Sequence, residues 1–260
     1  NVLRCDAGGI GLFRSEFLYM ESGSKPPTEE YQFQVYKLAA ETMGFKKVVI
    51  RTADLGGDKT AECLDLGSDP NPAIGYRGIR VSLDKEEVFK TQLRAILRAS
   101  AFGNLSIMFP MITSIEEVQL AKLMLEKAKK ELKKEKTSFD SDIPVGVMIE
   151  TPAAVMISGE LAREVDFFSI GTNDLLQLTL GMDRQNERLE RYFNPHHSAL
   201  LKMIRIITNN VHLEEKHISI CGDMAADLEM TEYLIQIGID ELSVAPNQVL
   251  ALRKKIREIQ

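Results

Sequence analysis

The chain has 260 residues, a hydrophobic content of 44% and a formal net charge of −6 at pH 7. This length suits one large α/β domain or two small ones. The acidic balance argues against a general nucleic-acid binder, which would carry a basic stripe, and no run of about 18 apolar residues is present to insert into a membrane.

The cysteines and the start of the chain indicate where the protein works. Cys5, Cys63 and Cys221 form no CxxC pair, which fits a reducing compartment better than a disulfide framework. The first residues lack the apolar core of a signal peptide, and the chain does not begin with Met. We therefore expect residues 1–260 to form one cytoplasmic domain of a longer protein.

The first predicted strand, 10–13, is a short apolar run that ends at a cation, Arg14. The next element is a helix that begins after Thr28, a typical N-cap residue, and continues to about Met43. Gly44 is in place to end this helix. Four of its apolar residues have helical spacing, and we expect them to face the core. They are Tyr31, Val35, Leu38 and Ala39.

A β-branched run at 48–50 predicts the second strand, and this strand also ends at a cation, Arg51. A turn at 56–59 (GGDK) follows, and then a loop rich in Gly, Pro and Asp that continues to about Pro72. Loops of this length in a compact domain are usually functional or disordered. Arg77, which comes next, adds another cation.

Two capping boxes mark helices in the middle of the chain. The pairs 84–87 and 114–117 each place Glu three residues after a typical N-cap residue. The run 106–109, between the two helices, is the third predicted strand. The lysine-rich end of the second helix, 129–136, is expected to be a solvated terminus rather than a binding patch.

The second half of the chain continues the alternation of strand and helix. Its predicted strands are 145–149, 167–170, 218–220 and 241–245. Its predicted helices are about 152–164, a short run that ends at Gly181, 198–213, one that follows Asp223 and ends at Ile237, and one that begins at 247. Polar residues follow three of these strands, and they are Glu150, Asn173 with Asp174, and Cys221.

Alternating strands and helices indicate parallel pairing and an α/β fold. No Gly-x-Gly-x-x-Gly opens a helix, so a dinucleotide-binding fold loses support. A (β/α)8 TIM barrel of roughly 250 residues fits better. Seven strands are recognisable, and we expect the first strand of the barrel to lie upstream of this chain.

In such a barrel the carboxyl ends of the strands share one face, where active sites lie. Arginine forks match phosphate and carboxylate oxygens, so several of them in an acidic protein suggest a small, multiply charged anion. Two carboxylates are the usual protein share of a Mg²⁺ site, and a thiol can act as acid, base or nucleophile. The candidate residues are Arg14, Arg51, Arg77, Glu150, Asn173, Asp174, Arg184 and Cys221.

Each candidate also has a structural explanation when it is taken singly. Glu150 and Asp174 could pair with the arginines, Cys221 could be a small buried apolar residue, and Lys59 could be a solvated turn residue. The histidine pair at 196–197 is expected to be plain surface, because its spacing is not that of a zinc site. Four arginines that converge with two carboxylates are harder to explain by structure alone.

Long motifs carry these candidates, and they occur in one order over nearly the whole chain. They are GIGLFRSEFLYM, VVIRTADLGGDK, NPAIGYRGIR, IMFPMI, GVMIETPAA, DFFSIGTNDLLQLTLGMDR and ICGDMAAD. With them the sequence resembles the phosphoenolpyruvate-binding domain of enzyme I of the bacterial sugar phosphotransferase system. Pyruvate phosphate dikinase and phosphoenolpyruvate synthase share the barrel and some of the motifs, but GGDK and DFFSIGTNDL look more like enzyme I.

The resemblance implies a phosphotransferase that acts on phosphoenolpyruvate in sugar uptake. It implies that Asn173, Asp174 and four arginines bind the substrate. It also implies that Glu150 and Asp174 hold Mg²⁺, so Asp174 has both roles. It implies that Cys221 protonates the enolate at C3 to give pyruvate. The four arginines are Arg14, Arg51, Arg77 and Arg184.

The resemblance also implies partners. In the family, the phosphoryl group passes to a histidine on a separate N-terminal domain and then to the carrier protein HPr, and the barrel domain carries a homodimer contact. None of the four histidines of this chain sits in a phosphoryl-accepting motif. The chain alone is therefore expected to bind phosphoenolpyruvate without turning over.

Rival functions stay open from the sequence. The barrel could belong to a dikinase or synthase, or to a carbon–carbon lyase that uses the same enolate chemistry. It could also be a non-catalytic module for dimerisation or ligand sensing, in which phosphoenolpyruvate only shifts an equilibrium.

Overall fold

The computed structural model describes residues 1–56, 59, 61–67, 71 and 74–259. Two predicted turn residues, Gly57 and Asp58, and part of the predicted loop after them lie outside the described residues. In the described part, no helix is both long and apolar enough to cross a membrane. The chain forms two compact units. Unit 1 contains Asn1–Gly11, Ile112–Ser114 and Val147–Gln260, and unit 2 contains Leu12–Met111 and Ile115–Gly146.

Seven strands of the described residues form one sheet, and their order in the sheet is their order in the chain. They are β1 (Ile10–Arg14), β2 (Val48–Arg51), β3 (Leu105–Phe109), β4 (Val145–Ile149), β5 (Phe167–Gly171), β6 (His217–Cys221) and β7 (Glu241–Leu242). The pairs β2–β3, β5–β6 and β6–β7 are parallel. Parallel strands in chain order, with helices between them, have the topology of a TIM-type α/β barrel, which confirms the predicted fold class.

The strands β2 to β5 are buried and mostly apolar, as a parallel sheet with two covered faces requires, whereas β1 and β7 are half-buried or exposed. Every residue of β2, β3, β4 and β5 is buried. The pairing register also aligns the strand ends, because Arg51 lies opposite Met108 in unit 2 and Gly171 lies opposite Cys221 in unit 1. The polar residues that follow β5 and β6 therefore start from the same level of the sheet.

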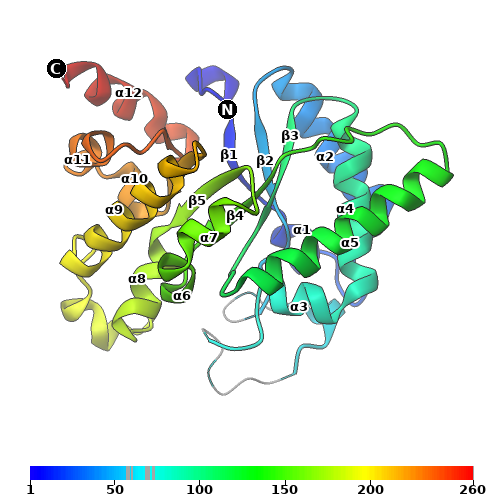
Figure 1. The fold of residues 1–260 in the computed structure, drawn as a ribbon, viewed down its shortest axis with the longest axis horizontal. Coiled ribbons are helices and arrows are strands. Elements are labelled where there is room, and N and C mark those ends of the chain that lie inside the picture. The colour runs from blue at the N-terminus through cyan, green and yellow to red at the C-terminus, as the bar shows by residue number, and fades with distance from the viewer. Residues whose placement is uncertain (57–58, 60, 68–70, 72–73, 260) are drawn as a thin grey trace. The chain divides into compact units, whose positions relative to one another are not determined.

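The helices of unit 2 pack around a central helix, α4. They are α1 (Glu16–Met20), α2 (Glu29–Met43), α3 (Ile79–Asp84), α4 (Glu86–Ser100) and α5 (Ile115–Lys134), with a short 3-10 turn at Glu62–Leu64. Helix α4 contacts both α2 and α5 (Figure 1). The predicted ends of α2 are confirmed, because Thr28 caps its first turn through Tyr31 N and Gly44 ends it with a positive φ of 60°.

The prediction of which face of α2 is buried was wrong. Tyr31 and Leu38 are 49% and 66% exposed, and the buried stripe is Gln32, Phe33, Tyr36, Ala40 and Met43. That stripe contains polar side chains, which the apolar pattern did not select. They can be buried because each finds hydrogen-bond partners: Gln32 Nε2 donates to Pro27 O at 3.0 Å, and Tyr36 Oη donates to Gln32 Oε1 at 3.1 Å.

The predicted capping box at 84–87 was also wrong. Asp84 is the last residue of α3, and α4 begins at Glu86 after Lys85 without a side-chain cap. The Asp84 carboxylate instead accepts a hydrogen bond from Tyr76 Oη. A carboxylate can satisfy a neighbouring hydroxyl as well as a helix terminus, and the sequence pattern does not distinguish the two.

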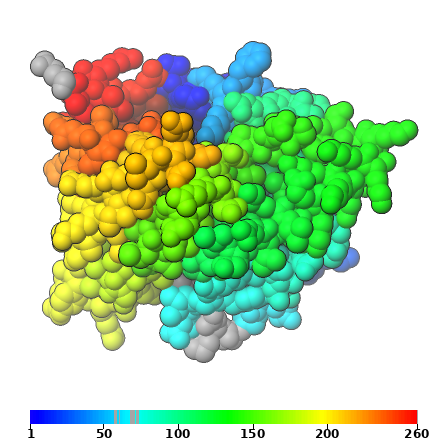
Figure 2. All heavy atoms as spheres, viewed as in Figure 1, coloured from blue at the N-terminus to red at the C-terminus, as the bar shows by residue number. Residues whose placement is uncertain are grey.

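An ion-pair network joins the outer surfaces of α2, α4 and α5. Arg94 contacts Glu29, Glu131 and Glu135 at 2.6, 3.1 and 2.7 Å, and Arg98 contacts Glu29 at 2.7 Å. The lysine-rich end of α5 is exposed, as predicted, and stands out from the rest of unit 2 (green, Figures 1 and 2).

The helices of unit 1 agree with the predicted order but are more interrupted. They are α6 (Pro152–Met156), α7 (Ser158–Ala162), α8 (Thr172–Leu180), α9 (Ser198–Leu213), α10 (Asp223–Ala226), α11 (Thr231–Gln236) and α12 (Val249–Glu258), with 3-10 turns at Leu3–Cys5, Glu187–Tyr192 and Pro246–Gln248. The single helix predicted from after Asp223 to Ile237 breaks at Asp227. There the carboxylate accepts Glu229 N at 2.8 Å, a local bond that competes with continued helix.

Candidate active site

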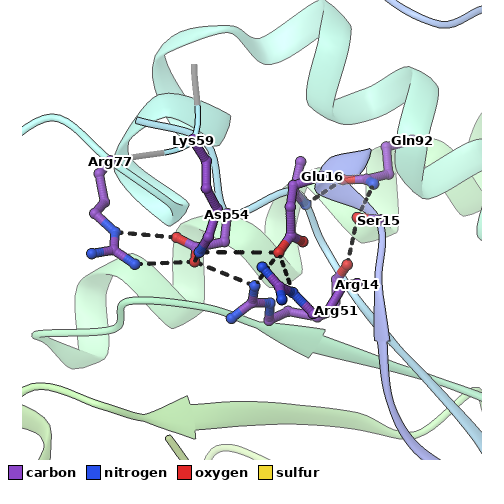
Figure 3. Close-up of polar contacts among 9 residues, drawn as sticks. Arg14, Ser15, Glu16, Arg51, Asp54, Lys59, Arg77 and Gln92 are labelled. Atoms are coloured by element: carbon purple, nitrogen blue, oxygen red, sulfur yellow. Dashed lines mark hydrogen bonds and ion pairs between the residues drawn. The ribbon is translucent and has the colours of Figure 1, made fainter. Parts of the chain in front are cut away.

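Unit 2 brings three predicted site residues into one cluster of charged side chains, which we call the cationic cluster. It contains four cations, Arg14, Arg51, Lys59 and Arg77, and two carboxylates, Glu16 and Asp54. Figure 3 shows the two carboxylates lying among the cations, with Arg51 reaching both. The cations come from the last residues of β1 and β2, from the loop after β2 and from the residues before α3.

Glu16, the first residue of α1, is the carboxylate shared by the strand-end arginines. Its Oε1 accepts Arg14 Nε at 2.8 Å and Arg51 Nη2 at 2.6 Å, and it lies 4.0 Å from Lys59 Nζ. The side chain is fully buried. Its second oxygen, Oε2, has no hydrogen-bond partner among the residues that the structure describes. A buried carboxylate in this setting is held almost entirely by its cations.

Asp54 holds the other side of the cluster. Arg77 binds it with two nitrogens, Nε at 3.3 Å from Oδ1 and Nη2 at 3.1 Å from Oδ2, and Arg51 Nη2 lies 3.3 Å from Oδ2. Lys59 Nζ donates to the same oxygen. Burial raises the pKa of Asp54, but the adjacent Arg51, Arg77 and Lys59 lower it by more, so its pKa lies well below the usual range.

The described side chains of the cluster carry a net charge of +2, from four cations and two carboxylates. Arg51, Lys59 and Arg77 are buried, and Arg14 is exposed. Three of the four cations are buried, and the two described carboxylates do not balance all four, so the cluster attracts an anion in a place where little water competes for it. The arrangement is therefore suited to binding an anion with several oxygens.

A layer of neutral polar side chains supports the cluster. Gln92 of α4 donates to Ser15 Oγ at 2.9 Å and to Tyr36 Oη at 3.1 Å, and its Oε1 accepts Ala53 N at 3.0 Å. Ser15 Oγ donates in turn to the carbonyl of Arg51 at 2.6 Å. Burial raises the pKa of Tyr36, which keeps its hydroxyl neutral. Gln92 thus ties together the backbone that carries both carboxylates.

Sequence reasoning missed Glu16 and Asp54, and it left Lys59 between two interpretations. Each missed carboxylate follows a strand-end arginine, Arg14 or Arg51, by two or three residues. That spacing was the available signal, because a buried arginine needs a nearby anion. The alternative that Lys59 is a solvated turn residue is wrong, since its side chain is 8% exposed and paired with Asp54.

In unit 1, the carboxylate predicted after β4 is buried against the next strand. Glu150 is 1% exposed. A Cβ atom added at Gly171 of β5 would meet Glu150 Oε2 at 2.9 Å and Glu150 Cβ at 3.0 Å. The Glu150 side chain therefore passes directly over the end of β5, in space that only glycine leaves open.

Asp174, in the first turn of α8, is the second predicted metal ligand and is also buried. Glu150 and Asp174 are thus two buried carboxylates that follow consecutive strands of the sheet. Among the described residues, no group of three or more His, Cys, Asp or Glu is arranged to hold a metal ion. A two-carboxylate donor set fits Mg²⁺, which keeps several waters and uses substrate oxygens, better than a metal that needs a full protein cage.

Asn173 makes a two-sided contact with Asp223 at the start of α10. Its Oδ1 accepts Asp223 N at 3.0 Å, and its Nδ2 donates to Asp223 Oδ2 at 3.2 Å. Thr172 has a partner as well, because its hydroxyl donates to the carbonyl of Cys221 at 2.8 Å. A Cβ at Gly222, whose φ is +88°, would lie 2.4 Å from Thr172 Oγ1. The loops after β5 and β6 are therefore braced together.

Cys221 is the last residue of β6, and its thiol is 6% exposed. The Sγ atom donates to Ile170 O at 3.4 Å, and the Ser169 hydroxyl lies 3.9 Å from Sγ. Arg184 lies beyond the end of α8, where its side chain is exposed and its backbone N–H donates to Gln177 Oε1 at 3.0 Å. Cys221 thus lies at a strand end, whereas Arg184 lies in the exposed segment that follows α8.

The histidine pair at 196–197 has structural contacts that the surface interpretation did not anticipate. His196 Nε2 lies 2.6 Å from Asp227 Oδ2, and this contact helps to lower the pKa of Asp227 against the raising effect of burial. His197 caps α9, because its Nδ1 accepts Ala199 N at 3.2 Å. Both histidines are accounted for by these contacts.

Comparison with known proteins agrees on one family. The model of the family described as "PEP-utilising enzyme, PEP-binding domain" matches residues 1–260. A phosphoenolpyruvate-protein phosphotransferase of Haemophilus influenzae is 48% identical over 256 residues, which are 98% of this chain and 44% of that protein. One of Bacillus subtilis is 44% identical over 258 residues, 99% of this chain and 45% of that protein. The chain spans less than half the length of these relatives.

Solved structures with lower sequence identity have the same fold. A citrate lyase of Burkholderia xenovorans superposes with a TM-score of 0.56 at 18% identity, over 87% of this chain and 63% of the other. A malate synthase of Haloferax volcanii, solved as a magnesium/glyoxylate complex, superposes with a TM-score of 0.53 at 13% identity, over 88% of this chain and 60% of the other.

Proposed function

This chain belongs to the family of phosphoenolpyruvate-binding domains of phosphoenolpyruvate-utilising enzymes, and from this we propose that it is the substrate-binding domain of a phosphoenolpyruvate-protein phosphotransferase. The relatives that match nearly its whole length carry that name. The proposed substrate is phosphoenolpyruvate, and the proposed acceptor of its phosphoryl group is a histidine on another domain of the full-length protein.

The observation that carries this proposal is the cationic cluster. Phosphoenolpyruvate has two anionic groups, a phosphate and a carboxylate, and the described side chains of the cluster carry a net charge of +2 with three of the four cations buried. Guanidinium groups bind such oxygens in pairs. In the proposal Arg14, Arg51 and Arg77 bind the phosphoryl group, while Arg184 and Asn173 contribute contacts to the substrate.

Glu150 and Asp174 are the proposed ligands of a divalent cation, Mg²⁺. Both are buried carboxylates, and this donor set leaves room for waters and substrate oxygens. When bound, the cation would neutralise charge on the substrate oxygens. The Haloferax malate synthase of similar fold was solved with magnesium, which supports a divalent cation on this architecture. Asp174 would also lie beside the substrate through that cation.

In the proposed reaction the bond between phosphorus and the enol oxygen breaks, and the phosphoryl group moves to the acceptor histidine. The electron pair of that bond stays on the oxygen as an enolate. The arginines hold the two anionic groups in place, and positioning with charge neutralisation is the main requirement of phosphoryl transfer. Cys221 then donates its thiol proton to C3, which gives pyruvate and a thiolate that regains a proton from water.

The proposal extends to the full-length protein. There the phosphohistidine would pass its phosphoryl group to the carrier HPr, and the protein would work as a cytoplasmic homodimer in sugar uptake. The identity of the relatives supports these partners. They are testable by adding the purified histidine domain and HPr to this chain and following phosphoryl transfer from labelled phosphoenolpyruvate.

Proton exchange tests the part of the reaction that this chain carries. Pyruvate is incubated in D₂O with Mg²⁺ and the protein, and loss of the methyl proton signal is followed by NMR. Cys221→Ala should exchange about 100-fold more slowly than the parent, the usual effect of losing a general acid or base. Cys5→Ala is the matched control, because that thiol lies outside the site.

Two results would contradict the proposal at different points. Equal exchange rates for the parent and Cys221→Ala would remove the acid role of that thiol while leaving substrate binding intact. Calorimetry that detects no binding of phosphoenolpyruvate in the presence of Mg²⁺ would contradict the substrate itself.

A further inference from the structure

The cationic cluster holds more than ligand-binding groups, because two of its six described side chains are anionic. Glu16 and Asp54 lower the net charge that attracts an anion, yet both are fully buried at its centre (Figure 3). We propose that Glu16 is a positioning residue that holds Arg14 and Arg51 in the orientation in which they bind the phosphoryl group. This inference rests on the proposed function.

The geometry supports the proposal because one oxygen serves two arginines from different strands. Glu16 Oε1 accepts Arg14 Nε at 2.8 Å and Arg51 Nη2 at 2.6 Å. Each guanidinium is a rigid planar fork of five N–H donors, so a short bond to one nitrogen restricts the directions in which the other donors can point. A single carboxylate thereby sets the relative orientation of the ends of β1 and β2.

Glu16 is itself held rigidly. Its side chain is fully buried, and its neighbour Ser15 is bonded to the Arg51 carbonyl at 2.6 Å and to Gln92 of α4 at 2.9 Å. The backbone that carries Glu16 therefore moves with β2 and α4. A side chain mounted in this way acts as a fixed reference point for its two arginines.

Charge and orientation make opposite predictions for removal of this carboxylate. Glu16→Gln raises the net charge of the described cluster from +2 to +3, and a purely electrostatic effect would strengthen binding of an anion. Loss of orientation would weaken it, because Arg14 and Arg51 would then repel one another without a shared partner. The sign of the change in affinity therefore decides between the two effects.

Asp54 provides an internal comparison. It binds Arg77 with two nitrogens and also contacts Lys59, so that side of the cluster keeps its own carboxylate in Glu16→Gln. The proposal therefore predicts a local effect. Arg14 and Arg51 lose their bond to Glu16, although Arg51 keeps its 3.3 Å contact with Asp54, and Arg77 keeps both of its bonds to Asp54.

The experiment uses the whole chain with three substitutions. Glu16→Gln removes the charge in the same shape, and Glu16→Asp keeps the charge but withdraws the carboxylate by one methylene. Glu30→Gln is the charge-matched control, because Glu30 is an exposed residue of unit 2 that pairs with Arg98 outside the cluster. Circular dichroism and a dispersed NMR spectrum first establish that each variant is folded at the temperature used.

Two readouts are then taken. Calorimetry with phosphoenolpyruvate and Mg²⁺ should show binding weakened about 10- to 100-fold in Glu16→Gln, the scale of a misplacement of about 1 Å. Glu16→Asp should also bind more weakly than the parent, whereas Glu30→Gln should bind like the parent. In ligand-free protein, the arginine Nε–Hε NMR signal of Arg14 should become mobile in Glu16→Gln. That of Arg51 should become less restricted to a smaller extent, because Arg51 keeps its contact with Asp54, and that of Arg77 should stay rigid.

Each outcome has a clear meaning. Binding that is unchanged or tighter in Glu16→Gln, or parent-like binding in Glu16→Asp, would overturn the positioning role. If Glu16→Gln does not fold, Glu16→Asp with its unchanged charge carries the same decision. If the parent itself fails to bind phosphoenolpyruvate, the proposed function is refuted, and the ligand-free arginine signals still report whether Glu16 orients Arg14 and Arg51.

Discussion

The substitution Asp54→Asn tests how much the buried charges contribute to stability. The wild-type carboxylate is fully buried, with Arg77 at 3.1 Å, Arg51 at 3.3 Å and Lys59 closer still. An amide of the same shape cannot neutralise these three cations. Its NH₂ group would also face the N–H groups of the cations, so that two hydrogen-bond donors meet without an acceptor. Breaking a buried ion pair from one side costs about 3–5 kcal/mol. Since Asp54 contacts three cations, of which Arg51 keeps its bond to Glu16, we expect a loss near the upper end, about 5 kcal/mol.

Urea unfolding followed by circular dichroism measures this loss. With a slope of about 3 kcal/mol per molar for a chain of this size, the midpoint should fall by roughly 1 to 2 M. The slope itself should not change, because the native fold is retained. Glu30→Gln, which removes an exposed carboxylate of the same unit, should shift the unfolding free energy by less than about 1 kcal/mol.

The same substitution makes a second, qualitative test possible. Phosphate in millimolar excess should restore part of the lost stability, because an anion that binds only the folded state stabilises it by mass action. A midpoint shift no larger than that of Glu30→Gln would refute the reasoning. It would mean that Lys59, Arg51 and Arg77 are neutralised well enough without Asp54.

Two further predictions concern pH and the strand that carries Glu150. Because the folded-state pKa of Asp54 lies below its ordinary value of 3.8, its stabilising effect is fully present above that value and is lost as the pH falls through the folded-state pKa. The difference in unfolding free energy between the parent and Asp54→Asn should therefore be constant from about pH 7 to pH 5 and should shrink only in more acidic solution. A difference that changes near neutral pH would contradict the lowered pKa of Asp54. In Gly171→Ala the new methyl would meet Glu150 Oε2 at 2.9 Å and displace this proposed metal ligand. Calorimetry should therefore show Mg²⁺-dependent binding of phosphoenolpyruvate weakened about 10-fold or more. Parent-like binding would show that Glu150 is not a ligand of the metal.

The helices and strands that could be predicted from the sequence are those whose ends are marked by polar residues or glycine at the limits of an apolar pattern. Helix α9 was predicted at its observed bounds, because an apolar stripe of helical period fills the whole span from Ser198 to Leu213. The strand β5 and the helix after it were likewise bounded by Asp166 and Gly181. In such segments local composition and tertiary packing favour the same structure, so the sequence pattern is sufficient to predict the element and its ends.

The errors occurred where a polar group is buried. The stripe of α2 with Gln32 and Tyr36 faces the core because both side chains are hydrogen-bonded there, while the more apolar-looking Leu38 is exposed. Hydrophobic spacing cannot predict which face of α2 is buried in this case, since it counts every polar residue as exposed. Asp84 was misplaced for a related reason, because its partner Tyr76 is fixed by the tertiary fold.

The candidate site divides in the same way. The positions of Arg14, Arg51 and Cys221 could be predicted, because each is the last residue of an apolar strand, where a barrel presents its chemistry. Glu16 and Asp54 could not, since an acidic residue beside a loop usually points to solvent. Their burial follows from a balance among several charges that come from different elements, and no single local window contains that balance.

The order of the strands has a consequence for how the protein is made. Each observed pairing joins strands that are consecutive in the chain, so a growing polypeptide can add them one at a time as it leaves the ribosome. All six described residues of the cationic cluster lie at or before Arg77, whereas Asp174 emerges roughly 5 to 20 s later at ordinary rates of synthesis. The part of the chain proposed to attract the anion is therefore synthesised well before the second proposed ligand of the metal.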